Sequence, residues 1–329
     1  MQAACSSASS CLHIEGERVA SLHTTYYKIG PYRVALTDFT IYKLAERLAP
    51  SFTPFKVKKD QNEEVLLQLV VDNQLESEDT IHAEDKSLQQ LSFDWDDASC
   101  RITFCSPGEH LIAIKPKQGK TTYCLKSKSG FTSAHLGVAS GLAPDEVHFV
   151  INNYLMMLYA FATAPRWMLL FHASAVVYRD KAYLFLGKSG TGKSTHSRLW
   201  LQYISGCHLL NDDNPLVEVE PINNQVIVYG SPWSGKTPCY RRESYPLGGL
   251  VRLEQAPANE MKRLTQLTAF AAVMPSCSVL RPEASVVNSV MQAIHQLIQH
   301  VPVFQLRCLP DREAALLSAH NLCTEIIQT

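Results

Sequence analysis

A phosphate-binding loop motif in the middle of the chain constrains its fold most strongly. Residues 183–195 read YLFLGKSGTGKST, in which four apolar residues lead into the pattern Gly-x-x-x-x-Gly-Lys-Ser. Gly187, Gly190 and Gly192 let the backbone curl closely around a phosphate, because they have no Cβ. Backbone N–H groups and the N-terminus of a following helix then supply partial positive charge. The motif therefore predicts a strand before Gly187, a helix over residues 196–203 and a nucleotide between them.

Within the motif the polar side chains have expected roles. Lys193 is placed to reach the β- and γ-phosphates, and the Ser194 hydroxyl is placed to ligate Mg²⁺. The alternative is a glycine-rich turn that fits the pattern by accident. A strand-like run before the loop and a helix-like run after it favour the nucleotide site. The residues expected to bind the nucleotide are Gly187, Lys188, Ser189, Gly190, Thr191, Gly192, Lys193, Ser194 and Thr195.

Two adjacent acidic residues follow the next predicted strand, which covers residues 207–210. Asp212 lies 18 residues beyond Ser194, so a helix and a strand return the chain to the side of the loop. An aspartate there is expected to hold Mg²⁺, and its neighbour Asp213 can serve as general base toward a substrate hydroxyl. The alternative is a solvated turn before Pro215.

The other runs around the motif predict a nucleotide-binding domain over residues 135–329. A helix is expected at 146–161, and two strand runs at 169–178 and 181–186 predict a hairpin that leads directly into the loop. A second hairpin is expected within 215–229, followed by a loop at 230–237 that is either functional or a plain surface turn. Further elements are expected at 247–253 (strand), 264–274 and 283–300 (helices), 303–307 (strand) and 311–322 (helix).

The N-terminal part of the chain has a different sequence pattern, which is rich in short predicted strands. Residues 1–25 are expected to form a disordered lead, since they lack the charged and apolar regions of a secretory signal. Residues 26–134 predict a β-rich, antiparallel domain with a short helix within 38–48. We expect this domain to be separable, with a boundary near 127–145. Its predicted strands cover residues 32–36, 65–71, 91–95, 101–105, 111–114 and 121–125.

Composition narrows the classes of protein. Of the 329 residues 46% are hydrophobic and 19% charged, and the formal net charge is −1, so no strongly basic nucleic-acid surface is indicated. The ten cysteines form no C-x-x-C pair and no zinc-ligand spacing, which is typical of free thiols in a reducing compartment. No apolar run approaches the length of a membrane span. We expect a cytoplasmic protein with no nucleic-acid or membrane partner, and homo-oligomer formation is left open.

Several of these segments together resemble the HPr kinase/phosphorylase-related family. They are residues 171–176 (FHASAV), 187–195, 211–213 (NDD) and 229–236 (YGSPWSGK), so that the resemblance covers roughly 170–329. Within that family, the chain most resembles the kinase-like members found beside peptide-modifying genes. It implies an α/β (α+β) fold, in which a C-terminal P-loop domain of the phosphoenolpyruvate-carboxykinase type follows a smaller β-rich N-terminal domain.

The resemblance also implies a set of site residues. ATP and Mg²⁺ are the implied cofactors, with Ser194 and Asp212 toward the metal. Asp212 and Asp213 match the family's paired acids, one facing the metal and one the acceptor hydroxyl, and which does which is left open. His172 matches a family histidine near the phosphates, so that the implied catalytic set is Asp212, Asp213, Lys193 and His172. The alternative for His172 is a buried core histidine on an apolar strand.

Three functions are therefore carried forward. The first is an ATP-dependent kinase, which transfers the γ-phosphoryl group to a hydroxyl of a protein serine, a peptide or a small metabolite. The second is a nucleotide-dependent switch or hydrolase. The third is a precursor-binding assembly protein in which the nucleotide site is structural. The acceptor itself is not indicated by any residue pattern.

Overall fold

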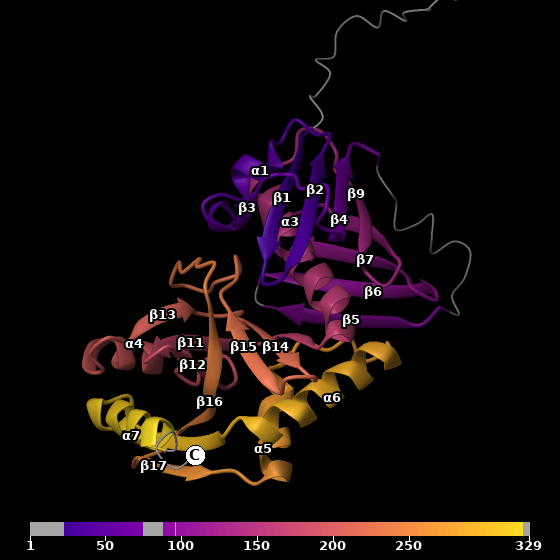
Figure 1. Cartoon of the computed structure of the whole chain (residues 1–329). Helices are drawn as coiled ribbons and strands as arrows, with labels where there is room; N and C mark the ends of the chain where they lie inside the picture. The colour runs from indigo at the N-terminus through magenta and orange to yellow at the C-terminus, as the bar shows by residue number, and fades with distance from the viewer. Residues whose placement is uncertain (1–22, 75–87, 96, 325–329) are drawn as a thin grey trace, which may run out of the picture.

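Two β-sheets, each of nine strands, and the helices packed on them make up the described part of the molecule (Figure 1). The structure is a computed structural model, and it describes residues 23–74, 88–95 and 97–324. The mixed α/β character expected from the sequence is confirmed. Of the expected disordered lead, residues 1–22 lie outside the described residues, whereas residues 23–25 already belong to the first strand.

The first sheet is built from the N-terminal part of the chain. Most neighbouring strands run antiparallel, but β2 is parallel to β4 and β4 is parallel to β9. The expectation of an antiparallel module is therefore wrong for these two pairs, because neither is joined by a hairpin: residues 39–64 separate β2 from β4, and residues 73–132 separate β4 from β9. In spatial order the strands are β3 (Lys56–Val57), β1 (His23–Ile29), β2 (Tyr32–Asp38), β4 (Val65–Asp72), β9 (Ser133–Gly137), β8 (Tyr123–Lys128), β7 (Glu109–Pro116), β6 (Ala98–Ser106) and β5 (Gln90–Trp95).

The helix expected within residues 38–48 is shorter than predicted. Only α1 (Leu44–Arg47) is helical, and a 3₁₀ turn follows at Thr53–Phe55. The carboxylate of Asp38 accepts hydrogen bonds from the backbone N–H groups of Thr40 and Leu44, each at 2.8 Å. A side chain that bonds nearby N–H groups holds the backbone in a turn, and this delays the helix.

Helix α3 (Pro144–Thr163) joins the two sheets. It packs on β4 and β7 of the first sheet and also contacts the second sheet. The segment Pro144–Arg166 is long and apolar enough to span a membrane, which the sequence analysis did not anticipate, yet 72% of its most apolar 18-residue window is buried inside the molecule. Packing between two sheets accounts for this apolar sequence, since such a helix is covered all round.

The second sheet carries the loop motif. Strands β12, β16 and β18 are parallel, while β11 pairs antiparallel with β12 and β13. The single strand expected over 169–178 is two strands, because the chain leaves the sheet at Phe171 and His172. The strands are β10 (Met168–Leu170), β14 (Leu216–Glu220), β15 (Gln225–Tyr229), β16 (Ser244–Gln255), β12 (Lys181–Leu186), β11 (Ala173–Tyr178) and β13 (His208–Asn211), with β18 (Val303–Cys308) between β16 and β17 (Glu260–Arg263).

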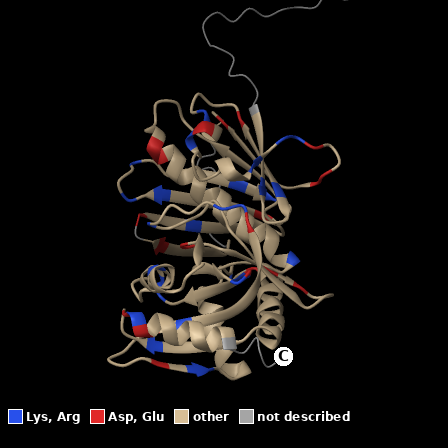
Figure 2. Cartoon of the chain, turned by 60° about the vertical axis from the view of Figure 1, so that its left-hand side comes forward, with Lys and Arg blue, Asp and Glu red and all other residues tan. Residues whose placement is uncertain are grey.

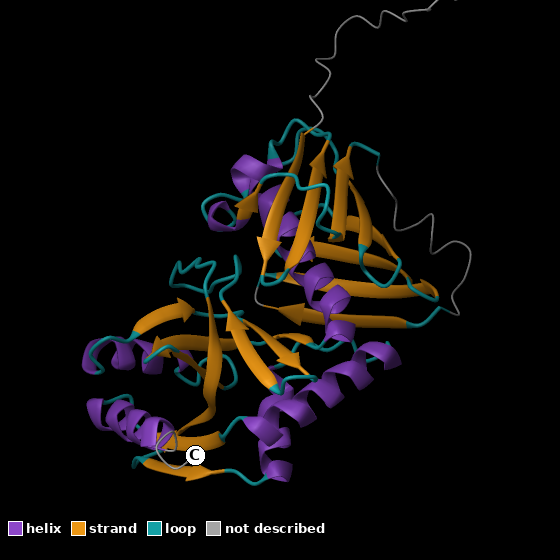
Figure 3. Ribbon diagram, viewed as in Figure 1, coloured by secondary structure: helices purple, strands orange, loops and turns teal. Residues whose placement is uncertain are grey.

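Helices cover the second sheet, as Figure 3 shows. Helices α4 (Lys193–Tyr203) and α7 (Arg312–Thr324) pack against each other, and α5 (Gln266–Val273) packs on α6 (Ala284–His300). Trp200 of α4 lies between Tyr183 and Phe185 of β12, with ring centroids 5.4 and 5.5 Å away, and its indole N–H donates to Ser318 of α7 at 2.8 Å. These contacts fix the helix that follows the loop.

Figure 2 marks the positions of charged residues along the ribbon. Among the described residues, lysine and arginine positions and aspartate and glutamate positions both occur in each half of the chain. An extended basic surface is the usual footprint of nucleic-acid binding. The absence of a nucleic-acid partner stays a prediction.

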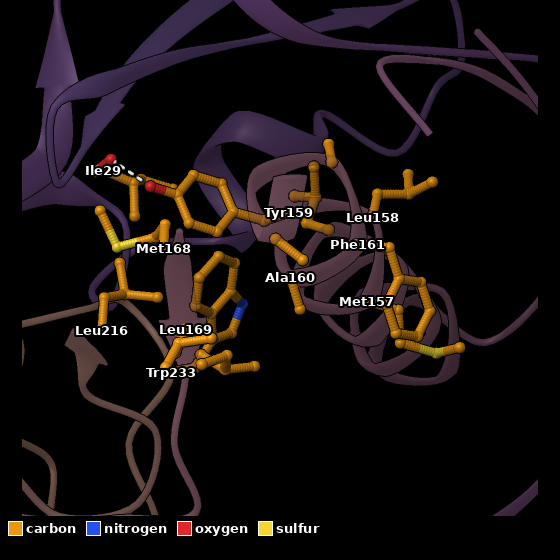
Figure 4. Close-up of a cluster of buried hydrophobic side chains, with 14 of the residues drawn as sticks. Ile29, Met157, Leu158, Tyr159, Ala160, Phe161, Met168, Leu169, Leu216 and Trp233 are labelled. Carbon is orange, nitrogen blue, oxygen red and sulfur yellow. Dashed lines mark hydrogen bonds between the residues drawn. The ribbon is translucent and has the colours of Figure 1, made fainter. Parts of the chain in front are cut away.

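One hydrophobic core runs through both halves of the chain. Figure 4 shows Tyr159 of α3 donating a hydrogen bond to the carbonyl oxygen of Ile29 in the first sheet, at 2.6 Å. Trp233, from the second half, packs on Tyr159 and on Phe52, with ring centroids 5.5 and 6.1 Å apart. These contacts join segments on either side of the expected boundary near 127–145, and the separability of the N-terminal domain stays a prediction.

We expect the two halves to unfold in one cooperative transition that Tyr159→Phe destabilises. The substitution leaves the buried carbonyl of Ile29 without its donor, which costs about 1–3 kcal/mol of unfolding free energy. Denaturant unfolding followed by circular dichroism and by tryptophan fluorescence measures this. Tyr203→Phe, at a 37% exposed tyrosine of α4, is the matched control. Two separate transitions, or equal stability of the two variants, would contradict the shared core.

Candidate functional site

The loop between β12 and α4 has the backbone shape that its glycines predict. Gly190 and Gly192 have φ values of 81° and 100°, a region that a Cβ makes costly. The Thr191 hydroxyl donates to the carbonyl oxygen of Lys188 at 2.8 Å and fixes the turn. Helix α4 begins at Lys193, so its N-terminal N–H groups lie at the end of the loop. A phosphate seated on the loop would meet these groups and the helix dipole.

The hairpin expected to deliver the loop is confirmed. Strands β11 and β12 pair in register, with Tyr178 opposite Lys181. The two turn residues between them, Arg179 and Asp180, both have positive φ, at 48° and 56°. This is the tight turn whose twist matches that of paired strands. The hairpin thus places His172 before β11 on the same side as the loop that follows β12.

Lys193 lies inside the site. It is 8% exposed, and its Nζ atom donates to the carbonyl oxygen of Gly187 at 3.0 Å. The same ammonium is 2.9 Å from Nε2 of His172. Burial lowers the pKa of the Lys193 ammonium, while the charge of Asp213 raises it. The lysine is thus held over the loop by bonds to Gly187 and His172.

His172 connects Lys193 to Asp213. Its Nδ1 atom lies 3.1 Å from Oδ1 of Asp213, whose other oxygen accepts from the amide of Asn214 at 2.7 Å. Because an ammonium only donates, Nε2 of a neutral His172 accepts from Lys193, and Nδ1–H donates to Asp213. The side chain of His172 is 46% exposed. The alternative of a buried core histidine is therefore wrong.

Asp212 occupies a different environment from its neighbour. It is 4% exposed, and its Oδ1 atom accepts from the Ser174 hydroxyl at 2.8 Å. Ser174 in turn lies 2.6 Å from the hydroxyl of Ser197 on α4, one helical turn beyond Ser194. Oδ2 of Asp212 is buried without a hydrogen-bond partner in the described residues. A solvated turn, the alternative reading of the acidic pair, does not describe Asp212.

Asn211 sets the directions of the two acids. Its side-chain oxygen accepts from the backbone N–H groups of Asp213 and Asn214, at 2.9 and 2.8 Å. Its amide donates to the hydroxyl of Ser231 and to the carbonyl of Trp233, both at 3.1 Å. One buried side chain therefore ties the end of β13 to the loop at 230–237.

The loop at 230–237 lies directly against the acidic pair. A Cβ added to Gly235 would lie 3.0 Å from the carbonyl oxygen of Asp212 and 3.2 Å from Cβ of Asp213. Trp233 is 3% exposed and belongs to the shared core, so a plain surface turn does not describe this loop. Lys236 is exposed at the far side of Gly235. The loop thus forms one wall beside the partly exposed Asp213.

Two hollows flank the phosphate-binding loop. One has a volume of about 550 Å³ and borders the start of α4, with apolar side chains of Leu199, Leu253 and Leu309 in its wall. The other has a volume of about 490 Å³ and borders the first loop residues. Its lining includes Lys188, Ser189, Gly190, Arg252, Glu254 and Gln305. Together they provide space at both ends of the loop.

The residues present fit a magnesium ion that is held jointly by protein and phosphate. Mg²⁺ takes one or two carboxylates and completes its shell with phosphate oxygens and water. The unpartnered Oδ2 of Asp212 would be one such ligand, and Ser194 at the first turn of α4 is the second candidate. Within the described residues no cluster of three or more His, Cys, Asp or Glu could hold a metal alone.

Three contributors to the site were not predicted from the sequence. Ser174 and Ser197 orient Asp212, and Asn211 orients Asp213. The position of Ser174 two residues after His172 in an apolar strand was the available signal, because a polar residue inside a buried strand needs a partner. Ser197 is 23 residues from Ser174 in sequence, and no local pattern predicts that their hydroxyls meet.

Comparison with known proteins adds no family to these observations. The resemblance to the HPr kinase/phosphorylase-related family stays a prediction from the motifs. Its carboxykinase-type fold stays one as well. No protein-family model and no curated protein matches the chain.

Proposed function

We propose that the chain is an ATP- and Mg²⁺-dependent phosphotransferase that phosphorylates a hydroxyl group. One observation carries the proposal. The loop lysine is bonded through His172 to Asp213, and the adjacent Asp212 keeps a buried oxygen without a partner. Phosphoryl transfer needs little covalent chemistry from a protein and depends mostly on positioning and charge neutralisation. We also propose that the second sheet and α4 form a P-loop domain of the carboxykinase/HPr-kinase type.

The two acids differ enough in their surroundings to be given separate roles. Asp212 is buried and directed by Ser174, which suits a metal ligand whose position must be fixed. Asp213 has a 32% exposed side chain beside Gly235, which suits a group that an incoming acceptor must reach. Bound Mg²⁺ would neutralise charge on the β- and γ-phosphates. Ser194 and Asp212 would hold it.

In the proposed reaction Asp213 acts as general base. The acceptor hydroxyl gives its proton to the Asp213 carboxylate as its oxygen bonds to the γ-phosphorus. The bond from that phosphorus to the oxygen that bridges to the β-phosphate breaks, and ADP leaves with the electron pair. Lys193 stabilises the charge on the phosphate oxygens throughout. His172 fixes the positions of the Lys193 and Asp213 side chains relative to each other, because it contacts both.

The apolar hollow beside α4 is the proposed place for the nucleoside. Leu199, Leu253 and Pro310 supply apolar walls, and the start of the helix lies at its edge. Small-molecule sites are mostly apolar with a few polar groups that fix orientation. A nucleoside there would direct its phosphates along the loop toward Lys188 and Ser189.

A screen of acceptors tests the proposal. The full chain is incubated with ATP and Mg²⁺ and with seryl peptides, protein serines, free amino acids or sugars, and the mass of each acceptor is measured. We expect one class to gain a phosphoryl group while ATP becomes ADP. ATP loss at the same rate with and without every acceptor would instead indicate a hydrolase or switch. If the chain does not bind ATP, both the phosphotransferase and the hydrolase or switch are excluded.

A further inference from the structure

Arg252 lies within β16, level with the end of the parallel strand β12 and beside the loop. In the register of β16 it is opposite Leu186, the last residue of β12 before Gly187. On its other side it is opposite Gln305 of β18. The loop motif therefore begins next to Arg252, although 65 residues separate Gly187 from it in sequence. Side chains at the carboxyl ends of parallel strands are where open α/β sheets bind ligands.

The side chain of Arg252 belongs to the face of the sheet opposite α4. Its neighbours Val251 and Leu253 pack in the core cluster of Trp200, between the sheet and the two helices. Successive side chains of a strand point to opposite faces, so Arg252 points away from that cluster. There it lines the hollow of about 490 Å³ with Lys188 and other loop residues.

Arg252 is half-buried, yet among the described residues it makes no hydrogen bond or ion pair. Glu254, the acidic residue nearest to Arg252 in sequence, has other partners. It accepts a hydrogen bond from Gln305 at 2.6 Å and lies 3.8 Å from Arg307. The charge of Arg252 also lowers the pKa of the Lys193 ammonium. Removing part of a guanidinium group from water costs free energy that an anionic partner would offset. Arg252 thus lines the hollow beside the loop, near enough to Lys193 to influence it, and no acid among the described residues pairs with it.

We propose that Arg252 is a phosphate-binding residue whose guanidinium binds oxygens of the γ-phosphoryl group. The inference rests on the proposed function and adds to it the residue that distinguishes ATP from ADP. The apolar hollow beside α4 takes the nucleoside, so the phosphates run along the loop and the terminal one reaches the adjacent hollow, which Arg252 lines. A planar guanidinium with several donors suits a phosphate with three free oxygens.

Calorimetric titration of Mg²⁺·ATP and Mg²⁺·ADP into the full chain tests the assignment. We expect Arg252→Gln to weaken ATP binding on the order of 10- to 100-fold and to leave ADP binding within about 2-fold, since only ATP has the third phosphate. We expect Arg252→Lys to have an intermediate affinity for ATP, because an ammonium keeps the positive charge but cannot donate two parallel hydrogen bonds as a guanidinium does. Arg307→Gln is the matched control, at an exposed arginine of β18 that pairs with Glu254 and Glu260.

The outcomes separate this inference from the proposed function. If the wild type binds ATP but transfers its phosphoryl group to no acceptor, the proposed function fails while the binding contrast still supports Arg252. Equal weakening of ATP and ADP, or no weakening of either, overturns the inference. A raised acceptor KM with unchanged ATP affinity also overturns it and assigns Arg252 to the acceptor. Equal melting temperatures of the Arg252→Lys variant and the wild type exclude misfolding as the cause.

Discussion

Replacing Lys193 with methionine is expected to reduce kcat/KM for ATP by at least about 10²–10³, the usual cost of one preorganised electrostatic contact. Lys193 is the only ammonium group in the described residues that bonds both the loop, at Gly187, and His172. The side chain of Lys193 is largely buried. Methionine therefore fills the same space without the charge. Steady-state kinetics at saturating acceptor measures the effect.

The control for this prediction is Lys188→Met, at an exposed lysine of the same loop. It removes a positive charge near the site but leaves the bonds of Lys193 in place. We expect a much smaller loss of kcat/KM. Circular dichroism spectra of the two variants should overlay that of the wild type. Turnover in Lys193→Met equal to that of the wild type would refute the site.

Asparagine substitutions at the acidic pair are expected to have two different effects. Asp213→Asn should lower phosphoryl transfer by about 10²–10⁴, the contribution of a general base, with ATP affinity near that of the wild type. Asp212→Asn should raise the Mg²⁺ concentration needed for half-maximal binding of ATP, because an amide is neutral. Oδ2 of Asp212 is the buried oxygen without a partner, whereas both oxygens of Asp213 are bonded to side chains.

Each of these two variants is the control for the other. Titration of Mg²⁺·ATP and a transfer assay are run on both, over a series of Mg²⁺ concentrations. If Asp213→Asn changes the Mg²⁺ requirement and Asp212→Asn does not, the roles are reversed. If both variants bind and transfer like the wild type, the acidic pair has a structural role and the mechanism is wrong.

Local signals in the sequence predicted local structure well. The Arg179–Asp180 turn, the strand before Gly187 and the helix after Lys193 were each expected from a run of residues, and each is confirmed. The reason is that hairpin turns and helix starts depend on residues close together in the chain. The confirmed hairpin over β14 and β15 follows the same rule.

Contacts between distant segments could not be predicted. Pairing of β4 with both β2 and β9, the packing of Trp233 on Phe52 and the bond from Ser174 to Ser197 each join segments with no shared local pattern. The alternative roles of Asp212 and Asp213 were left open for the same reason. Asp212 and Asp213 are adjacent residues of the same type, and only their different burial in the structure distinguishes them. No local pattern singles out Arg252, because the strands that place it beside the loop are remote in the chain.

The fate of the γ-phosphoryl group tests the central claim most directly. ATP labelled in that group is supplied with Mg²⁺ and an acceptor from the screen, and the label is measured on the acceptor and in inorganic phosphate. We predict that the wild type places the label on an acceptor hydroxyl, and that the transfer is lost in Lys193→Met. Label found only in inorganic phosphate, whichever acceptor is present, would contradict the account.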